Sequence, residues 1–227
     1  MKDSHKWSGK TIQPFRGEGT SGECTWEVLY EDIRIEGPGK MGNYGETTAT
    51  GPTHAPWYKA SPYLVRAMLC HGVTNIGDNA FWKCTRLSYF IFDPSLESIG
   101  AHAFSGCRSL YDMLMPDSVV KIGEMAFFGC SSLREVHISN SLTEIPAHAF
   151  GGCTSLGRVK IPSSITSIGT GAFSGCPNLT LEVEYGSAGY RYAKDNNIPI
   201  RVSATVQVNG KQTKRISSGQ MITRGIS

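Results

Sequence analysis

The sequence contains no long run of apolar residues, although 40% of its 227 residues are hydrophobic. A membrane-spanning helix needs about 20 consecutive apolar residues, so none is predicted. The first twenty residues also lack the apolar core of a secretory signal, because they include Lys2, Asp3, His5, Lys6 and Lys10. The sequence is therefore expected to be either a cytosolic protein or a mature fragment with an added start Met.

Over most of the chain, neither positive nor negative charge is in excess. The formal net charge is +3, and residues 204–227 contribute +4 through Lys211, Lys214, Arg215 and Arg224, with no acidic residue. The remaining residues have 18 basic and 19 acidic side chains, so this part is close to neutral. A nucleic-acid-binding domain needs a basic stripe, and the neutral body of the chain argues against nucleic acid as a partner.

A strict internal repeat is the strongest feature of the sequence. Five positions are identical in five successive repeats of 23 residues. A repeat of this length cannot fold alone, and it becomes stable by burying its apolar side chains against its neighbours in a solenoid. The repeated residues are Ile76, Ile99, Ile122, Ile145 and Ile168; Ala80, Ala103, Ala126, Ala149 and Ala172; Phe81, Phe104, Phe127, Phe150 and Phe173; Cys84, Cys107, Cys130, Cys153 and Cys176; Leu87, Leu110, Leu133, Leu156 and Leu179.

Each repeat is predicted to contain one strand and one turn. Apolar residues follow the repeated Leu at the third and fifth positions, as at Val136 and Ile138, and this alternation predicts a strand with one buried face. The short Ala-Phe-x-x-Cys stretch predicts a helical turn on the opposite side. The strands are expected to form one parallel sheet, starting near Leu64, Leu87, Leu110, Leu133, Leu156 and Leu179.

Segments of different composition precede and follow the repeats. Residues 1–23 are expected to be flexible, and residues 24–57 to form a β-rich cap with a hairpin, because Trp26, Val28 and Tyr30 alternate before Ile33 and Ile35. The repeats are assigned to residues 58–185. Residues 186–203 are expected to form a second cap, with a helix at 187–197 and a strand at 198–202. Residues 204–227 contain a hairpin signal at 206–210 and are read as a tail or the start of a further domain.

The repeats at both ends depart from the pattern. Tyr58, Ser61, Leu64 and Leu69 occupy the Phe, Cys, Leu and fifth strand positions of a degenerate first repeat. After Leu179 the apolar residues are instead Leu181, Val183 and Tyr185. We therefore expect the register to change where the solenoid ends.

The pattern Ile-Gly-x-x-Ala-Phe-x-x-Cys-x-x-Leu, as written here from Ile122 to Leu133, resembles the BspA-type leucine-rich repeat. The resemblance covers about residues 58–185. It implies a leucine-rich-repeat solenoid with a parallel β-sheet on one side and short turns on the other, a β-rich N-terminal cap and a helical C-terminal cap. It also implies a bacterial surface or secreted protein used in adhesion, with an extracellular or cell-surface location.

Neither the cysteines nor the histidines point to a catalytic or metal site. The repeated cysteines are expected to form a line spaced by roughly 4.7–4.9 Å per repeat, reduced and without metal, where each packs as a small apolar side chain. Cys24 and Cys70 lie outside this line, and a disulfide between them stays open. His102 and His148 share a position two repeats apart, roughly 9–10 Å, which is too far for shared metal ligation. No catalytic residues, metal ligands or cofactor are therefore assigned, and the protein is not expected to be an enzyme.

The solvent face of the predicted sheet carries the candidate ligand-binding residues. Positions two and four after each Leu point away from the core, and position one adds Val65 and Tyr111; this face is apolar and aromatic in the first repeats and charged later. An exposed apolar patch marks a contact site, unless the cap or neighbouring side chains cover it. The candidate residues are Met68, Tyr89, Ile91, Tyr111 and Leu114. Trp82 and Phe128 share another position that is predicted to be exposed, and they form a second, smaller candidate contact.

Three functions agree with these residues. The first is a protein-binding or adhesion module, with a host extracellular protein as the expected class of partner. The second is a structural spacer that displays another domain. The third is a carbohydrate-binding domain, which the exposed Tyr and Trp residues favour. The sequence does not identify the ligand or the oligomeric state.

Overall fold

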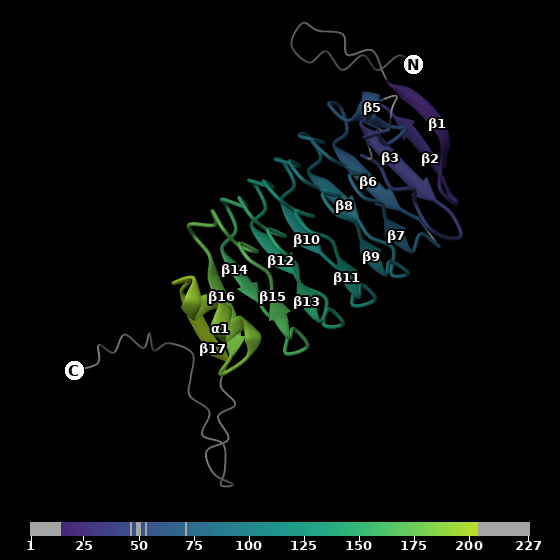
Figure 1. The fold of residues 1–227 in the computed structure, drawn as a ribbon. Helices are drawn as coiled ribbons and strands as arrows, with labels where there is room; N and C mark the ends of the chain where they lie inside the picture. Colours follow the sequence, from purple (N-terminus) through teal and green to yellow (C-terminus); the bar gives the residue numbers. More distant parts are fainter. Residues whose placement is uncertain (1–14, 46, 49–50, 53, 71, 204–227) are drawn as a thin grey trace, which may run out of the picture.

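The computed structural model is an elongated solenoid in which the first and last described residues lie at opposite ends of the stack (Figure 1). It describes residues 15–45, 47–48, 51–52, 54–70 and 72–203. The predicted hairpin at 206–210, as well as His5 and His71, therefore lies outside the described residues. Within the described part of the chain, no helix is both long and apolar enough to cross a membrane.

One strand of each repeat lies in a row along the solenoid. The row comprises β6 (Arg66–Leu69), β8 (Tyr89–Ile91), β10 (Asp112–Leu114), β12 (Glu135–His137), β14 (Arg158–Lys160) and β16 (Thr180–Glu184). All pairings in the row are parallel, and each strand alternates between buried and exposed side chains, as at Met113 and Leu114. The predicted strands are thus present, starting one or two residues after each Leu.

The row is not one uninterrupted sheet. Among the described strands it is hydrogen-bonded in two groups, with no pairing between β8 and β10, whereas the sequence predicted a single sheet. The interruption lies beside Phe90 and Phe92, whose rings contact each other at 4.8 Å between centroids and are only partly buried. The next three repeats have Met, Val or Ile at these positions, and no other repeat has an aromatic residue there, so this is the repeat with the bulkiest inward side chains.

A second row of short parallel strands was not predicted. It ends each time on the repeated Ile and forms two groups, β7–β9–β11 and β13–β15. Two-residue strands give too little alternation to be recognised in a sequence. Their bounds are β7 (Asn75–Ile76), β9 (Ser98–Ile99), β11 (Lys121–Ile122), β13 (Glu144–Ile145) and β15 (Ser167–Ile168).

The turn segment, residues 77–84 and their equivalents, lies where the helical turn was predicted, but its backbone is not helical. It contains successive β-turns, each closed by a hydrogen bond from the N–H of residue i+3 to the carbonyl of residue i. Examples are Ala80 N to Gly77 O at 3.3 Å and Cys84 N to Phe81 O at 3.0 Å. The third residue of these turns has a positive φ, 55° at both Asn79 and Lys83, as in a type II turn. An α-helix allows no such residue, because all of its φ angles are negative.

The turn segment also forms a third ladder between repeats. Alternate backbone N–H groups donate to the next repeat, as from Phe81 N to Ala103 O and from Lys83 N to Ser105 O, both at 2.8 Å. The ladder continues through the equivalent bonds of the later repeats, so the backbone polar groups of the buried turn are satisfied. Each pair of neighbouring full repeats is therefore joined by at least two of three sets of backbone hydrogen bonds: those of the first strand row, the second strand row and the turn segments.

One aromatic ring per repeat forms a column through the core, which we call the ring column. Adjacent Phe rings lie 5.2–5.4 Å apart between centroids and within 8° of parallel. Trp57 continues the column before Phe81 at 5.6 Å, whereas Tyr58, the residue predicted for this position, is exposed. The prediction of Tyr58 was wrong because the degenerate repeat is one residue out of register. The ring column consists of Trp57, Phe81, Phe104, Phe127, Phe150 and Phe173.

The N-terminal end is covered by strands that extend the first sheet. β2 (Cys24–Leu29) and β3 (Asp32–Glu36) form the predicted hairpin, and β3 pairs in parallel with β6. β1 (Arg16–Ser21) pairs with β2, so the sheet begins inside the segment 1–23 that was expected to be flexible. A short pair, β4 (Thr47–Thr48) and β5 (Gly51–Pro52), and the 3-10 turn η1 (Tyr58–Ala60) follow.

The C-terminal end is covered by a helix and a strand. Helix α1 (Ala188–Asp195) begins after Ser187, whose hydroxyl accepts a hydrogen bond from Tyr190 N at 3.1 Å, as expected for an N-cap. The ring of Tyr192 contacts Phe173 edge-on at 6.1 Å and ends the ring column. β16 pairs with β14 at an offset of 22 residues, Arg158 with Thr180, so the expected register change is present, and β17 (Ile200–Ser203) completes the sheet.

Two neighbouring phenylalanines test the assignment of the inner and outer faces. Phe127 is fully buried in the ring column, whereas Phe128 is 39% exposed. Phe127→Ala should lower the free energy of unfolding by about 3–5 kcal/mol because it leaves a cavity. Phe128→Ala should change it by about 0.5 kcal/mol or little more. Urea denaturation of both variants measures the difference, and equal midpoints would contradict the assignment.

Candidate functional site

The five candidate residues lie on the solvent face of the strand row and form what we call the apolar patch: Met68, Tyr89, Ile91, Tyr111 and Leu114. Each of them is between 42% and 65% exposed. Met68 is the direct parallel partner of Ile91, and Tyr89 is that of Arg66. The structure therefore brings side chains from β6, β8 and β10 to one face, as the alternation predicted.

The N-terminal cap does not cover the apolar patch. Since β3 extends the sheet beside β6, its outward side chains border the patch and do not lie over it. Arg34 is the partner of Met68 and forms an ion pair with Glu36. Arg66 forms two hydrogen bonds with the Asp32 carboxylate, at 2.6 and 2.8 Å. Paired charges thus edge the patch on this side.

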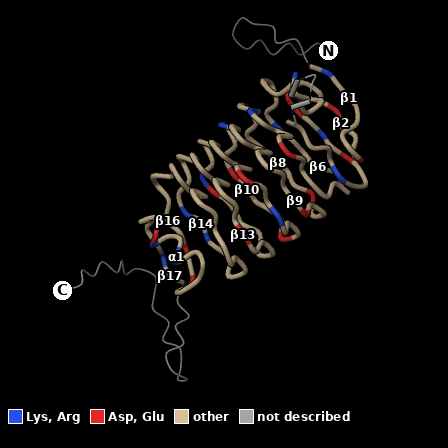
Figure 2. Tube along the Cα trace, in the orientation of Figure 1, with Lys and Arg blue, Asp and Glu red and all other residues tan. Residues whose placement is uncertain are grey.

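The strand face becomes charged beyond the apolar patch. A shallow hollow of about 500 Å³ lies there, between strands β10 and β16. The guanidinium of Arg134 lies 5.0 Å from the centroid of the Tyr111 ring and joins the patch to this charged area. Acidic residues lie on β10, β12 and β16 and basic residues on β14, so both signs of charge occur on neighbouring strands (Figure 2). The hollow is lined by Tyr111, Asp112, Arg134, Glu135, Val136, His137, Arg158, Lys160 and Glu182.

His137 is the exposed histidine of this face. Its Nε2 atom lies 3.4 Å from a carboxylate oxygen of Asp117. Asp117 also accepts hydrogen bonds from the backbone and side-chain amides of Asn140, and these bonds lower the pKa of its carboxyl. Both side chains are about half exposed, so the pair is a surface contact.

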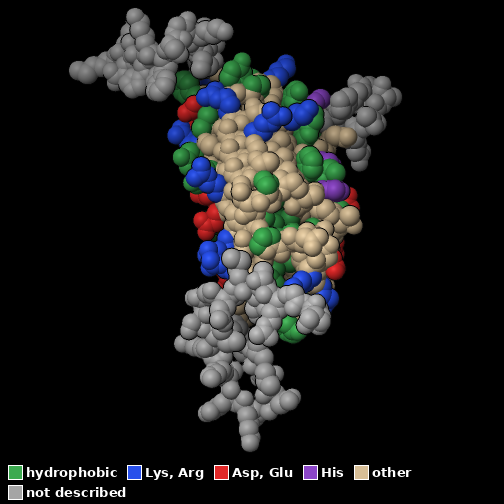
Figure 3. All heavy atoms as spheres, turned by 90° about the vertical axis from the view of Figure 1, so that its left-hand side faces the viewer, with side chains coloured by type: hydrophobic (Ala, Val, Ile, Leu, Met, Phe, Trp, Pro, Cys, Tyr) green, Lys and Arg blue, Asp and Glu red, His purple; other side chains and the backbone are tan. Residues whose placement is uncertain are grey.

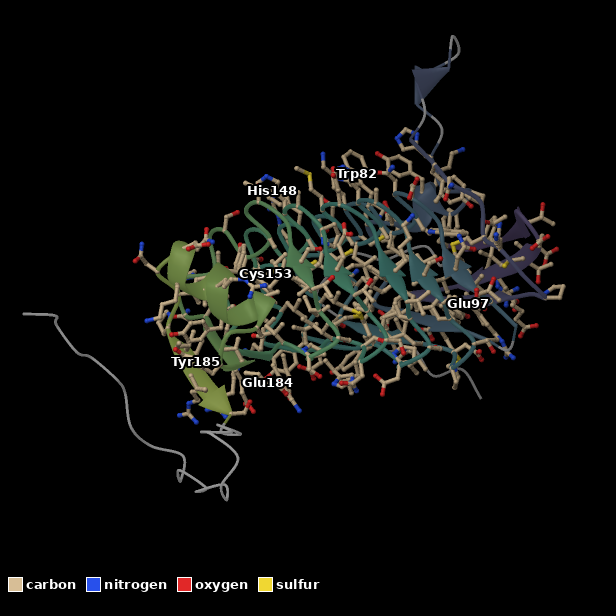
Figure 4. All side chains as sticks on the ribbon, turned by 60° about the horizontal axis from the view of Figure 1, so that its bottom comes forward. Trp82, Glu97, His148, Cys153, Glu184 and Tyr185 are labelled. Carbon is tan, nitrogen blue, oxygen red and sulfur yellow. The ribbon has the colours of Figure 1, made fainter. Side chains whose placement is uncertain are left out.

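Trp82 and Phe128 lie on the turn segments and not on the strand face. The Lys83 ammonium lies 4.0 Å from the centroid of the Trp82 ring. The Phe128 ring faces the edge of His148 at 6.5 Å between centroids. Trp82 and His148 lie along the same edge of the solenoid (Figure 4). The two aromatic side chains are separated by Ser105 of the repeat between them, so they do not form one continuous contact.

A pocket that the sequence analysis missed lies between the N-terminal cap and the first full repeat. We call it the cap pocket; its volume is about 220 Å³, and its lining is mostly apolar and aromatic. The signal was present in the sequence, since Trp82 and Lys83 replace the Ser or Gly of most later repeats, but only the fold brings them beside the cap. Its lining includes Tyr44, His54, Trp57, Tyr58, Asn79 and Trp82.

The repeated cysteines form the predicted line inside the turns, and Cys153 lies within the stack (Figure 4). Each thiol from the second full repeat onward donates to the carbonyl of the preceding Phe, as from Cys107 to Phe81 O at 3.1 Å. Burial raises the pKa of Cys84 and Cys130 to about 12. The thiols are therefore protonated at neutral pH and are poor nucleophiles.

Cys24 and Cys70 are separate free thiols. The Cys24 thiol donates to Gly39 O at 3.5 Å, and the Cys70 sulfur accepts from the guanidinium of Arg34 at 3.1 Å. In the described ranges, no group of three or more His, Cys, Asp or Glu side chains is arranged to hold a metal ion. The geometry of the described residues offers binding surfaces.

Comparisons with known proteins agree on the architecture. Residues 59–181 match six copies of the family described as "BspA type Leucine rich repeat region". The crystal structure of the T. pallidum leucine-rich repeat protein is 26% identical, with a TM-score of 0.56, over 84% of this chain and 97% of that one. The pneumococcal vaccine antigen PcpA shares the fold at 19% identity, with a TM-score of 0.52, over 75% of this chain and 50% of that one. No curated protein is significantly similar in sequence.

The buried thiols make the stability of the protein sensitive to alkaline pH. The folded-state pKa of Cys84 and Cys130 lies near 12, above the ordinary value of 9.0, so folding disfavours the thiolate. Their contribution to stability is complete below pH 9 and is lost as the pH rises from 9 towards 12. Within that window each thiol should lower the free energy of unfolding by up to about 1.4 kcal/mol per pH unit.

Denaturant unfolding at a series of alkaline pH values measures this loss. The double variant Cys84→Ala, Cys130→Ala should show a shallower decline than the unmodified protein, although it starts from a lower stability. Parallel slopes for the two proteins between pH 9 and 11 would show that the thiols do not titrate as the structure requires.

Proposed function

Because this chain belongs to the BspA-type leucine-rich repeat family, we propose that it is a non-enzymatic module that binds a protein partner through the apolar patch. Repeats of this family are in general not enzymes, and they generally bind proteins. The proposal includes adhesion to a host extracellular protein and a secreted or cell-surface location in a bacterium, as the resemblance implies.

The observation that carries the proposal is the exposure of five large apolar side chains on one rigid face. Met68, Tyr89, Ile91, Tyr111 and Leu114 all expose at least 42% of their surface. Large exposed apolar side chains in one cluster are typical of contact sites, and Tyr is frequent among the residues that dominate binding energy. The ladder between β6 and β8 holds Met68, Tyr89 and Ile91, and Leu114 lies on β10, which is paired with β12, so little backbone entropy is lost on binding.

The charges around the apolar patch support a protein surface as the ligand. Arg34 and Arg66 border it on one side, and Asp112, Arg134, Glu135 and His137 on the other. A dry centre inside a polar, mixed-charge rim is the usual anatomy of a protein–protein interface. The face of the molecule shown in Figure 3 does not have this arrangement of charges around an apolar centre, since its charged side chains lie mainly along its edges.

The proposal predicts that acidic residues in the apolar patch abolish binding without unfolding the protein. Ile91 and Leu114 are 54% and 64% exposed, so Ile91→Asp with Leu114→Asp should change the free energy of unfolding by about 0.5 kcal/mol per site. Desolvating two carboxylates against an apolar partner should lower affinity at least about a hundredfold. The measurement is affinity capture from a defined set of host extracellular matrix and serum proteins, followed by titration of each captured protein.

Val120→Asp is the matched control. Val120 is 56% exposed but lies away from the strand row, and Glu97 already stands at its repeat position. The control should bind as the unmodified protein does. If no protein of the set binds, or if the double variant keeps full affinity, the patch is not the binding surface. A large loss of stability in the double variant would mean that the patch is covered within the fold.

A further inference from the structure

The cap pocket lies on a different surface from the apolar patch and offers a second kind of binding site. Its floor is apolar and buried, with Trp57, Ala55 and Ala80 almost inaccessible to solvent. Two of its sides carry aromatic side chains: Tyr58, whose ring lies 4.0 Å from that of His54, and the partly exposed Trp82. The polar groups in the lining include the Asn79 amide and the Ser61 hydroxyl.

The residues on the repeat side of the cap pocket depart from the repeat in an energetically unfavourable way. Lys83 has a φ of 55°, and the four later repeats all have glycine at this position, with φ between 71° and 78°. Only glycine adopts this backbone region without steric cost. Trp82 stands where the next repeat has Ser105 and the last has Ser174. Strained side chains of this kind cluster at binding sites.

Lys83 does not line the cap pocket itself, but it contacts Trp82, which does. The ammonium of Lys83 lies 4.0 Å from the centroid of the Trp82 ring, within the range of a cation–π contact. No described acidic side chain forms an ion pair with Lys83. The first full repeat therefore places a cation against the ring of a pocket-lining tryptophan, whereas no later repeat has Trp followed by Lys at these two positions.

We infer that the cap pocket binds the terminal ring of a glycan and prefers an acidic sugar. A pyranose has an apolar C–H face, which packs on aromatic rings such as Trp82 and Tyr58, and an edge of hydroxyls. The hydroxyls would donate to the Asn79 side-chain oxygen, whose own Nδ2 donates to Tyr44 O at 2.7 Å, and bond to the Ser61 hydroxyl. A volume of about 220 Å³ is below that of a drug-sized site and suits one sugar ring. The Lys83 ammonium pairs with the carboxylate of an acidic sugar.

Titration of four simple sugars tests the inference. Methyl glucoside and methyl galactoside are the neutral probes, and glucuronic acid and N-acetylneuraminic acid are the acidic ones, followed by saturation-transfer NMR. At least one acidic sugar should bind saturably with a Kd of roughly 1–10 mM, about threefold or more tighter than the neutral sugars at low salt. Trp82→Ser should lose at least about tenfold in affinity, and it should fold, because serine occupies this position in two other repeats.

Two further variants separate the contribution of the Lys83 charge from that of the aromatic ring in the cap pocket. Lys83→Gly restores the residue of the later repeats, so it should not lower the melting temperature, and it should remove the preference for acidic sugars. Phe128→Ser changes the same repeat position as Trp82 but away from the cap pocket, and it should bind every sugar as the unmodified protein does.

The result that overturns the inference is the absence of saturable binding by all four sugars at roughly 50 mM, or equal binding by the Trp82→Ser variant and the unmodified protein. The Ile91→Asp, Leu114→Asp protein should keep its sugar binding. Failure of the sugar site is therefore distinguishable from failure of the proposed protein-binding patch, because each has its own variants and its own ligand.

Discussion

The stacking of one phenylalanine ring per repeat sets the distance at which successive repeats can lie. The rings are 5.2–5.4 Å apart and almost parallel, close to the spacing that hydrogen bonds between parallel strands require. Ring packing and backbone pairing therefore favour similar distances between successive repeats. In addition, the thiol of a repeat donates a hydrogen bond to the Phe carbonyl of the preceding repeat. Trp57 and Tyr192 close the two ends of this column with rings of their own, so neither terminal Phe faces water.

Five positions that hold the same residue in each full repeat leave the surface free to differ from repeat to repeat. These Ile, Ala, Phe, Cys and Leu positions are constant and the inward strand positions stay apolar, whereas the outward positions change from Met68 and Ile91 to His137 and Lys160 along one row. Both proposed binding surfaces consist of residues that break the repeat. The apolar patch uses the outward strand positions of the first repeats, and the cap pocket uses Trp82 beside the cap.

Much of this architecture could be predicted because period and alternation are local properties of a sequence. The strand positions, the exposure of the apolar patch and the N-cap at Ser187 all follow from such patterns. Other features depend on contacts between distant residues. Trp57 replaced Tyr58 in the ring column because packing against Phe81, and not residue spacing, decides which ring points inward. The cap pocket could not be predicted for the same reason, since its lining residues come from the cap, the degenerate repeat and the first full repeat, which only the fold brings together.

The shorter step at the end of the solenoid has a consequence for how such a chain can change in length during evolution. Between β12 and β14 the strands are offset by 23 residues, but between β14 and β16 by 22. Duplication or loss of a whole 23-residue unit between β8 and β14 keeps the Ile, Ala, Phe, Cys and Leu positions of neighbouring repeats opposite one another. The same event across the last step has to keep the 22-residue offset as well, because the strand that precedes α1 is paired at that offset. The final repeat and its helix are therefore expected to be inherited together, while the number of preceding repeats varies.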